Sequence, residues 1–177
     1  MDIYFEGFVY SDAVFPNNQF IGNQFAYTTK RKIMSTSFSN NPHLVRGLRD
    51  NNPGNIRPNQ HDHWIGQVGV ENNYVIFQDI EHGIRAMAKD IKSKINGHGW
   101  DTIAKYIPAY APPEDHNNTE GYIQRVCNST GFKRDEILRA DFATLVKLVK
   151  AHIQVELGND AHMITDTMIN DGVLMAI

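Results

Sequence analysis

The sequence lacks several features that whole classes of protein require. Among 177 residues there is a single cysteine, Cys127, which excludes a disulfide within the chain. The sequence around it, QRVCNSTG, lacks the neighbouring His that a nucleophile would need, so we expect a buried structural thiol. No apolar run approaches the roughly 18 residues of a membrane span, and no transmembrane segment is expected.

A strong excess of charge of one sign is also lacking. Lys and Arg total 17 against 20 Asp and Glu, so the formal net charge is −3, and the sequence has no basic block. Because nucleic-acid binding depends on Lys and Arg at phosphates, nucleic acid is not expected as a partner. The N-terminus, MDIYFEGFVY, carries Asp2 and Glu6 where a secretory signal needs positive charge, so export by a signal peptide is not expected.

The remaining composition suits one globular domain with an appendage. The apolar fraction is 41% and the charged fraction is 21%. Six of the nine phenylalanines lie in the first 38 residues without a helical or strand period. We therefore predict an extended aromatic arm over residues 1–41 and a domain over residues 42–177. The arm either wraps its own domain or places its aromatic side chains on a partner.

The domain itself is predicted to be mainly α with a small β-hairpin lobe. Val68 and Val70 before the turn ENN, with Tyr74 and Ile76 after it, indicate a hairpin. Apolar residues at helical spacing, N-terminal caps at Thr119, Asp141 and Thr165, and glycine stops then predict helices. These helices fall within residues 79–97, 100–110, 117–131, 140–158 and 165–177. Residues 150–156 are expected to form a solvated helix face above an apolar stripe.

A polar loop, RGLRDNNPGNIRPNQHDHWIG at residues 46–66, precedes the hairpin. Side-chain amides suit the hydroxyl and acetamido groups of sugars, and flat aromatic faces suit pyranose rings. The candidate substrate-binding residues are therefore Asn51, Asn52, Asn55, Trp64, Tyr110 and Tyr122. The same Asn-Pro-Gly-Asn sequence is also ordinary turn chemistry, and Trp64 equally suits a plug for the hairpin, so both interpretations stay open.

Several motifs carry a resemblance to known proteins. DNNPGNIR, WIGQ, YVIFQDIEHGIRAMAKDI, DTIAKYIPAYAPPEDHNNTEGYIQRV and MINDGVLMA resemble a family of small phage proteins known as virion structural proteins or muralytic enzymes. The resemblance covers residues 46–176. More distantly, the loop, the hairpin and the following helix are similar to glucosaminidases of the lysozyme superfamily.

The resemblance implies a lysozyme-like fold and a peptidoglycan hydrolase, of lysozyme or lytic transglycosylase type, located in the virion. Its implied partners are bacterial peptidoglycan and, through the arm, other virion proteins, with no cofactor. The alternative that it leaves open is a non-catalytic virion structural protein, such as a vertex, spike or adhesion module.

Glycoside cleavage requires a carboxylic acid that an apolar setting keeps protonated. The resembled glucosaminidases carry a Glu on a helix before the Asn-Asn turn, whereas residues 24–48 contain no Asp or Glu. Glu81 is the first candidate because Phe77, Ile80 and Ile84 could desolvate it, although an acid that interacts with a helix N-terminus is its other interpretation. The further candidates are Asp50, Glu71, Glu114 and Glu120.

A metal site is not expected. His61, Asp62 and His63 in HDHW have no fixed spacing to a third ligand.

Overall fold

The computed structural model describes residues 4–8, 28–32, 35–39, 41–59 and 63–177, and it divides the chain into two units, Met1–Met34 and Ser35–Ile177. In the first unit, strand β1 (Tyr4–Phe8) pairs antiparallel with β2 (Thr28–Lys32), with Tyr4 opposite Lys32. The segment expected as an extended arm therefore contains a small sheet. Phe15, Phe20 and Phe25 lie outside the described residues. Residues 35–41 belong to the second unit, where Phe38 packs against the core.

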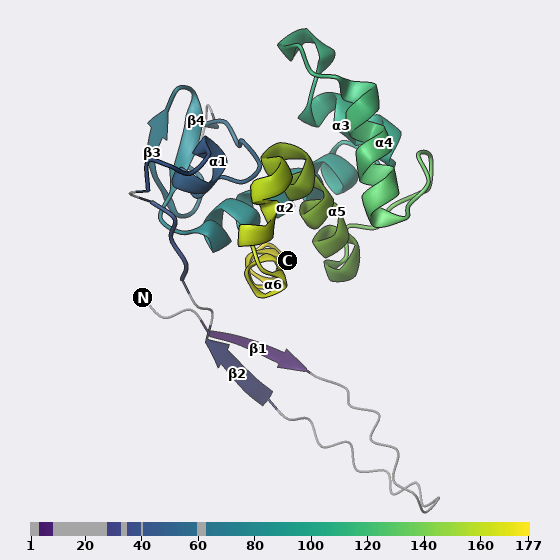
Figure 1. The fold of residues 1–177 in the computed structure, drawn as a ribbon. Coiled ribbons are helices and arrows are strands. Elements are labelled where there is room, and N and C mark those ends of the chain that lie inside the picture. The colour runs from purple at the N-terminus through teal and green to yellow at the C-terminus, as the bar shows by residue number, and fades with distance from the viewer. Residues whose placement is uncertain (1–3, 9–27, 33–34, 40, 60–62) are drawn as a thin grey trace, which may run out of the picture. The chain divides into compact units, whose positions relative to one another are not determined.

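The described part of the second unit is mainly helical with one small antiparallel sheet, which confirms the predicted class (Figure 1). Its strands are β3 (Gln67–Glu71) and β4 (Tyr74–Phe77). Its α-helices are α1 (Arg46–Arg49), α2 (Ile80–Gly97), α3 (Ile103–Tyr110), α4 (Thr119–Thr130), α5 (Phe142–Leu157) and α6 (Asp166–Leu174). Two 3-10 helices span Pro113–Asp115 and Gly158–Met163. None of the described helices is long and apolar enough to cross a membrane.

Local sequence signals explain most of these boundaries. The side chain of Asp141 caps α5 by accepting from Thr144 N, and Gly158 ends the helix at φ 54°. At α4 the cap is Asn118 and not the predicted Thr119, because the Asn118 side chain accepts from Gly121 N. The hairpin turn places Asn72 and Asn73 at φ 48° and 66°, the left-handed values that a two-residue turn with matching twist requires.

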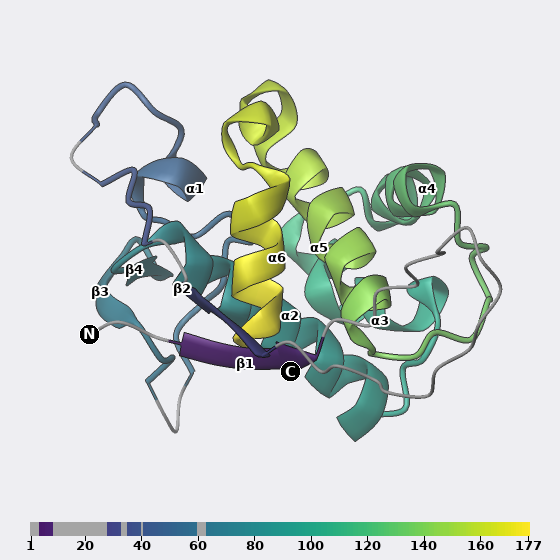
Figure 2. The same cartoon turned by 90° about the horizontal axis from the view of Figure 1, so that it is seen from below.

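The core lies where α2 contacts α5 and α6, and α4 packs on both α3 and α5. Gly172 lets α6 approach α2 closely, since a Cβ there would lie 2.5 Å from Ile84 Cγ2. In Figures 1 and 2 the α3–α4 pair and the β3–β4 hairpin lie on opposite sides of α2, α5 and α6. The polar loop runs beside β4, because Val75 N donates to Ile56 O and Phe77 N to Asp50 O.

Candidate functional site

A polar groove of about 320 Å³ is formed by residues from both sides of the second unit. The polar loop and the hairpin supply one wall, and α2, α3, α5 and the segment between α3 and α4 supply the rest. The lining residues are Gly54, Asn55, Ile56, Arg57, Trp64, Tyr74, Asp90, Lys94, Tyr110, Ala111, Asn117 and Glu156. A groove that combines carboxylates, amides and aromatic rings suits a polar, ring-containing ligand.

Three of the predicted substrate-binding residues, Asn55, Trp64 and Tyr110, lie in this groove. The half-buried Trp64 donates from its indole Nε1 to Arg57 O at 3.0 Å, which fixes the ring at the wall. Tyr110 donates from its hydroxyl to Gly54 O at 2.9 Å and so ties α3 to the polar loop. Tyr74, which was predicted only as a hairpin residue, also lines the groove, and its ring carries the Arg46 guanidinium at 3.5 Å from its centre.

Asn51 lies inside the unit and not on the groove wall. It is 0% exposed and has φ 51°, a left-handed value that asparagine tolerates. Its Oδ1 accepts from Phe38 N at 2.9 Å, and its Nδ2 donates to Phe77 O at 3.0 Å and to two serine hydroxyls. The amide therefore joins residues 37–39 to β4.

Asn52 is equally internal, at 1% exposed. Its Oδ1 accepts from Ile56 N at 2.8 Å, and its Nδ2 donates to the carbonyls of Ile56 and Val75. Buried backbone groups need partners, and this side chain supplies them where the polar loop meets β4. The two asparagines shape the loop that carries Asn55 to the groove.

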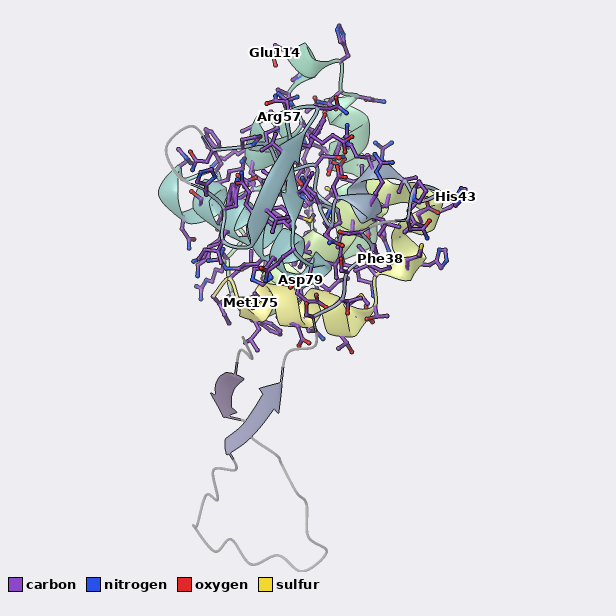
Figure 3. All side chains as sticks on the ribbon, turned by 90° about the vertical axis from the view of Figure 1, so that its left-hand side faces the viewer. Phe38, His43, Arg57, Asp79, Glu114 and Met175 are labelled. Atoms are coloured by element: carbon purple, nitrogen blue, oxygen red, sulfur yellow. The ribbon has the colours of Figure 1, made fainter. Side chains whose placement is uncertain are left out.

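Glu81 lies at the start of α2, away from the groove lining. It is 2% exposed, and its Oε2 accepts from Thr36 N at 2.9 Å. Burial raises the pKa of the Glu81 carboxyl, as its apolar neighbours predicted, although the hydrogen bond from Thr36 opposes this. Figure 3 shows its neighbour Asp79 and the groove residue Arg57 toward opposite ends of the unit.

Asp50 and Glu71 are brought together beside the hairpin by Arg49. Its guanidinium lies 3.9 Å from Asp50 Oδ1 and 3.9 Å from Glu71 Oε2. Asp50 is buried, and burial together with the charge of Glu71 raises the pKa of the Asp50 carboxyl. Neither carboxylate is among the groove residues.

The groove instead contains two carboxylates that were not predicted as site residues, Asp90 and Glu156. Glu156 was expected on a solvated face, but it is half-buried. Its Oε1 accepts from the Tyr122 hydroxyl at 2.8 Å, and its Oε2 accepts from Asn55 Nδ2 at 2.7 Å. Burial raises the pKa of the Glu156 carboxyl, although these two hydrogen bonds oppose the rise. A signal was present, since residues 145, 149, 152 and 156 follow one helix face.

Behind Glu156 lies a buried polar cluster. Tyr122, predicted as a substrate-binding residue, is buried and joins Glu156 to His152, whose Nδ1 lies 2.8 Å from the Tyr122 hydroxyl. His152 is 0% exposed, and its Nε2 lies 3.0 Å from the Tyr106 hydroxyl. Burial, assisted by the charge of Lys94, lowers the pKa of His152 to about 3, so the imidazole is neutral near pH 7.

Charged groups surround the two groove carboxylates. Lys94 Nζ lies 2.5 Å from Asp90 Oδ1, and Arg46 Nη2 donates to Asn55 Oδ1 at 2.8 Å.

Across the described residues no group of three or more His, Cys, Asp and Glu side chains is placed to hold a metal ion. His61 and Asp62 lie outside the described residues, and His63 is exposed. Cys127 is half-buried.

The second unit is mainly helical, and its polar groove is lined in part by aromatic side chains. No sequence model of a known protein family matches the chain. Over 122 residues the chain is 33% identical to Protein P5 of Pseudoalteromonas phage PM2, an alignment that covers 67% of this chain and 74% of the phage protein. The chain therefore belongs to the family of Protein P5, and the predicted similarity to a phage protein is confirmed.

Proposed function

We propose that this protein is a virion-associated, lysozyme-like peptidoglycan hydrolase that binds and cleaves glycan strands in the groove. The observation that carries the proposal is the half-buried carboxyl of Glu156, held by Tyr122 and Asn55 among aromatic rings. The similarity of the protein to a phage protein supports a role in the virion. Glu156 takes the place of Glu81, Glu71 and Asp50 as the proposed acid, since those three lie away from the groove.

The groove residues suit the chemistry of glycoside cleavage. A general acid must hold a proton near the working pH and give it to the leaving-group oxygen, and burial favours the protonated form of Glu156. A second carboxylate either stabilises the oxocarbenium-like transition state or activates water. Asp90, held by Lys94 on α2, lies in the same groove and is the residue we assign to this role.

Release of soluble fragments from purified peptidoglycan, read by mass spectrometry, tests the proposal. Glu156 must be protonated to act, and its pKa is raised. Activity should therefore persist to a higher pH than an ordinary glutamate would allow, and fall as the pH rises through that pKa. Absence of release between about pH 4 and 8 by folded protein would contradict cleavage, since this range spans the usual titration of glutamate and beyond.

The aromatic wall yields a binding prediction. Trp64→Ala should weaken binding to insoluble peptidoglycan by roughly 1 to 3 kcal/mol, because a well-packed aromatic contact is lost. Pull-down assays at several protein concentrations measure this change. Trp100→Ala is the matched control, because Trp100 is also half-buried but stacks on His98 outside the groove lining. Equal losses of binding in both variants, or a collapse of the melting temperature of Trp64→Ala with unchanged binding, would place Trp64 in a purely structural role.

A second candidate function is a non-catalytic virion structural protein. The observation that favours it is the absence of any Asp or Glu in residues 24–48, where the resembled glucosaminidases carry their acid. This function predicts tight binding to peptidoglycan or to virion proteins without release of fragments, so the same assay separates the two functions.

In either function we assign residues 1–34 to attachment to other virion proteins. A truncated protein that begins at Ser35 should stay folded and bind peptidoglycan, yet fail to enter particles. One that begins at Asn41 should also melt at a lower temperature, because Glu81 and Asn51 lose Thr36 N and Phe38 N. Thermal melts and particle incorporation measure the two effects. Normal incorporation of the Ser35 protein would contradict the attachment role.

A further inference from the structure

A continuous chain of hydrogen bonds leads from the core to the groove. Tyr106, on α3, contacts His152 Nε2 at 3.0 Å, and His152, on α5, contacts the Tyr122 hydroxyl through Nδ1 at 2.8 Å. Tyr122, on α4, then contacts Glu156 Oε1 at 2.8 Å. Three helices thus contribute side chains to one polar line, and its first two members are completely buried.

Proton counting gives this line a direction. The Tyr106 hydroxyl is buried and its proton needs an acceptor, for which the described residues offer His152 Nε2. Because His152 is neutral it carries one N–H, which must then be on Nδ1. Nδ1–H donates to the Tyr122 oxygen, so the Tyr122 hydroxyl cannot donate to the imidazole and donates to Glu156 instead. Every hydrogen bond in the line is donated toward the groove.

We propose that Tyr106, His152 and Tyr122 are positioning residues, whose one-way chain of hydrogen bonds holds the Glu156 carboxyl in one orientation and favours its charged form. The proposal rests on the function proposed for Glu156. Tyr122 fixes Oε1 and Asn55 fixes Oε2 as acceptors, so the carboxyl cannot rotate without losing both donors. The hydrogen bond that this line donates to Glu156 opposes the effect of burial and so limits the rise in the pKa of the carboxyl.

Other groups also act on the carboxyl, and Tyr106→Phe leaves all of them in place. The titratable and charged side chains among the described residues that face Glu156 or share its groove are Arg46, Arg57, Tyr74, Asp90, Lys94, Tyr110, Tyr122 and Arg125. Arg46 and Arg125 favour the charged form. A change in Glu156 titration after removal of a distant hydroxyl therefore reports on the chain itself.

The test is NMR titration of the full-length protein with 13C-labelled glutamate and 15N-labelled histidine, assigned with Glu156→Gln and His152→Gln. Tyr122→Phe removes the direct donor and should raise the Glu156 midpoint by about one pH unit, the size expected for loss of a hydrogen bond to a charged group. Tyr106→Phe does not touch Glu156, yet it should raise the midpoint by a smaller amount, because His152 can then adopt the tautomer that accepts from Tyr122. Ser129→Ala is the control and should leave the midpoint unchanged, since it removes an α4 hydroxyl that donates to Gln154 of α5 outside the line and the groove lining.

Two results would overturn the chain. One is an Nε2–H tautomer of His152 in the unchanged protein, a measurement that does not depend on any variant folding. The other is an unmoved Glu156 midpoint in folded Tyr106→Phe. Neither readout requires activity, so the proposed line of hydrogen bonds can be confirmed even if the protein does not cleave peptidoglycan. Where cleavage occurs, the upper limb of the pH–rate profile should move to higher pH in Tyr106→Phe and Tyr122→Phe.

Discussion

Replacing Glu156 with glutamine is expected to leave the fold intact and to lower the rate of glycan cleavage by roughly 10² to 10⁴, the usual contribution of a positioned proton donor. The amide oxygen can still accept one of the two hydrogen bonds that Tyr122 and Asn55 donate, but the side chain can no longer give a proton to the leaving group. Rates of fragment release at several pH values, with a thermal melt to show folding, measure the effect.

The controls are the corresponding changes at the other candidate carboxylates. Glu81→Gln, Glu71→Gln and Asp50→Asn alter groups that lie away from the groove, so they should retain turnover wherever the protein stays folded. A folded Glu81→Gln protein without activity, beside an active Glu156→Gln protein, would move the acid to the start of α2.

The largest expected loss of stability follows the change Asn51→Ala. This change strands the partly buried Phe38 N–H and the buried Phe77 carbonyl, and each unsatisfied buried group costs about 1 to 3 kcal/mol. Alanine at φ 51° adds about 1 to 2 kcal/mol of backbone strain. We expect a loss of roughly 3 to 5 kcal/mol, which denaturant unfolding measures.

Asn72→Ala separates the two contributions. Asn72 has φ 48° but is exposed at the hairpin turn, so alanine there carries the backbone strain without the loss of buried hydrogen bonds. It should lose only about 1 to 2 kcal/mol. Equal losses in the two variants would show that the amide of Asn51 contributes little to stability.

The elements with local signals were predictable from the sequence. Helices α2, α5 and α6 carry their own caps and apolar stripes. The turn residues Asn72 and Asn73 predict the hairpin. The strands β1 and β2 were not predicted, because their pairing joins segments separated by residues 9–27 and neither strand alternates cleanly in hydrophobicity.

The site was harder to predict because its chemistry depends on partners distant in sequence. An amide serves a sugar hydroxyl and a buried backbone group equally well, so the loop sequence alone could not distinguish Asn51 and Asn52 from Asn55. Glu81 was predicted to be desolvated and is, but its partner is Thr36, 45 residues earlier. Glu156 meets Asn55 across 101 residues, a contact that only the folded chain creates.

The hydrogen bonds at residues 35–38 have a mechanical consequence. Ser35 Oγ donates to Asp79, and Phe38 N donates to the side chain of Asn51. The carbonyl of Thr36 accepts from Ile80 N, and its N–H donates to Glu81. The chain enters the second unit at Ser35, so a pull along the backbone from residues 1–34 is passed to these hydrogen bonds. This pull would act first on the start of α2 and on the buried amide of Asn51. Asp90 and Glu156 each lie more than two helical turns from the start of their helices, so the pull would not act on them first.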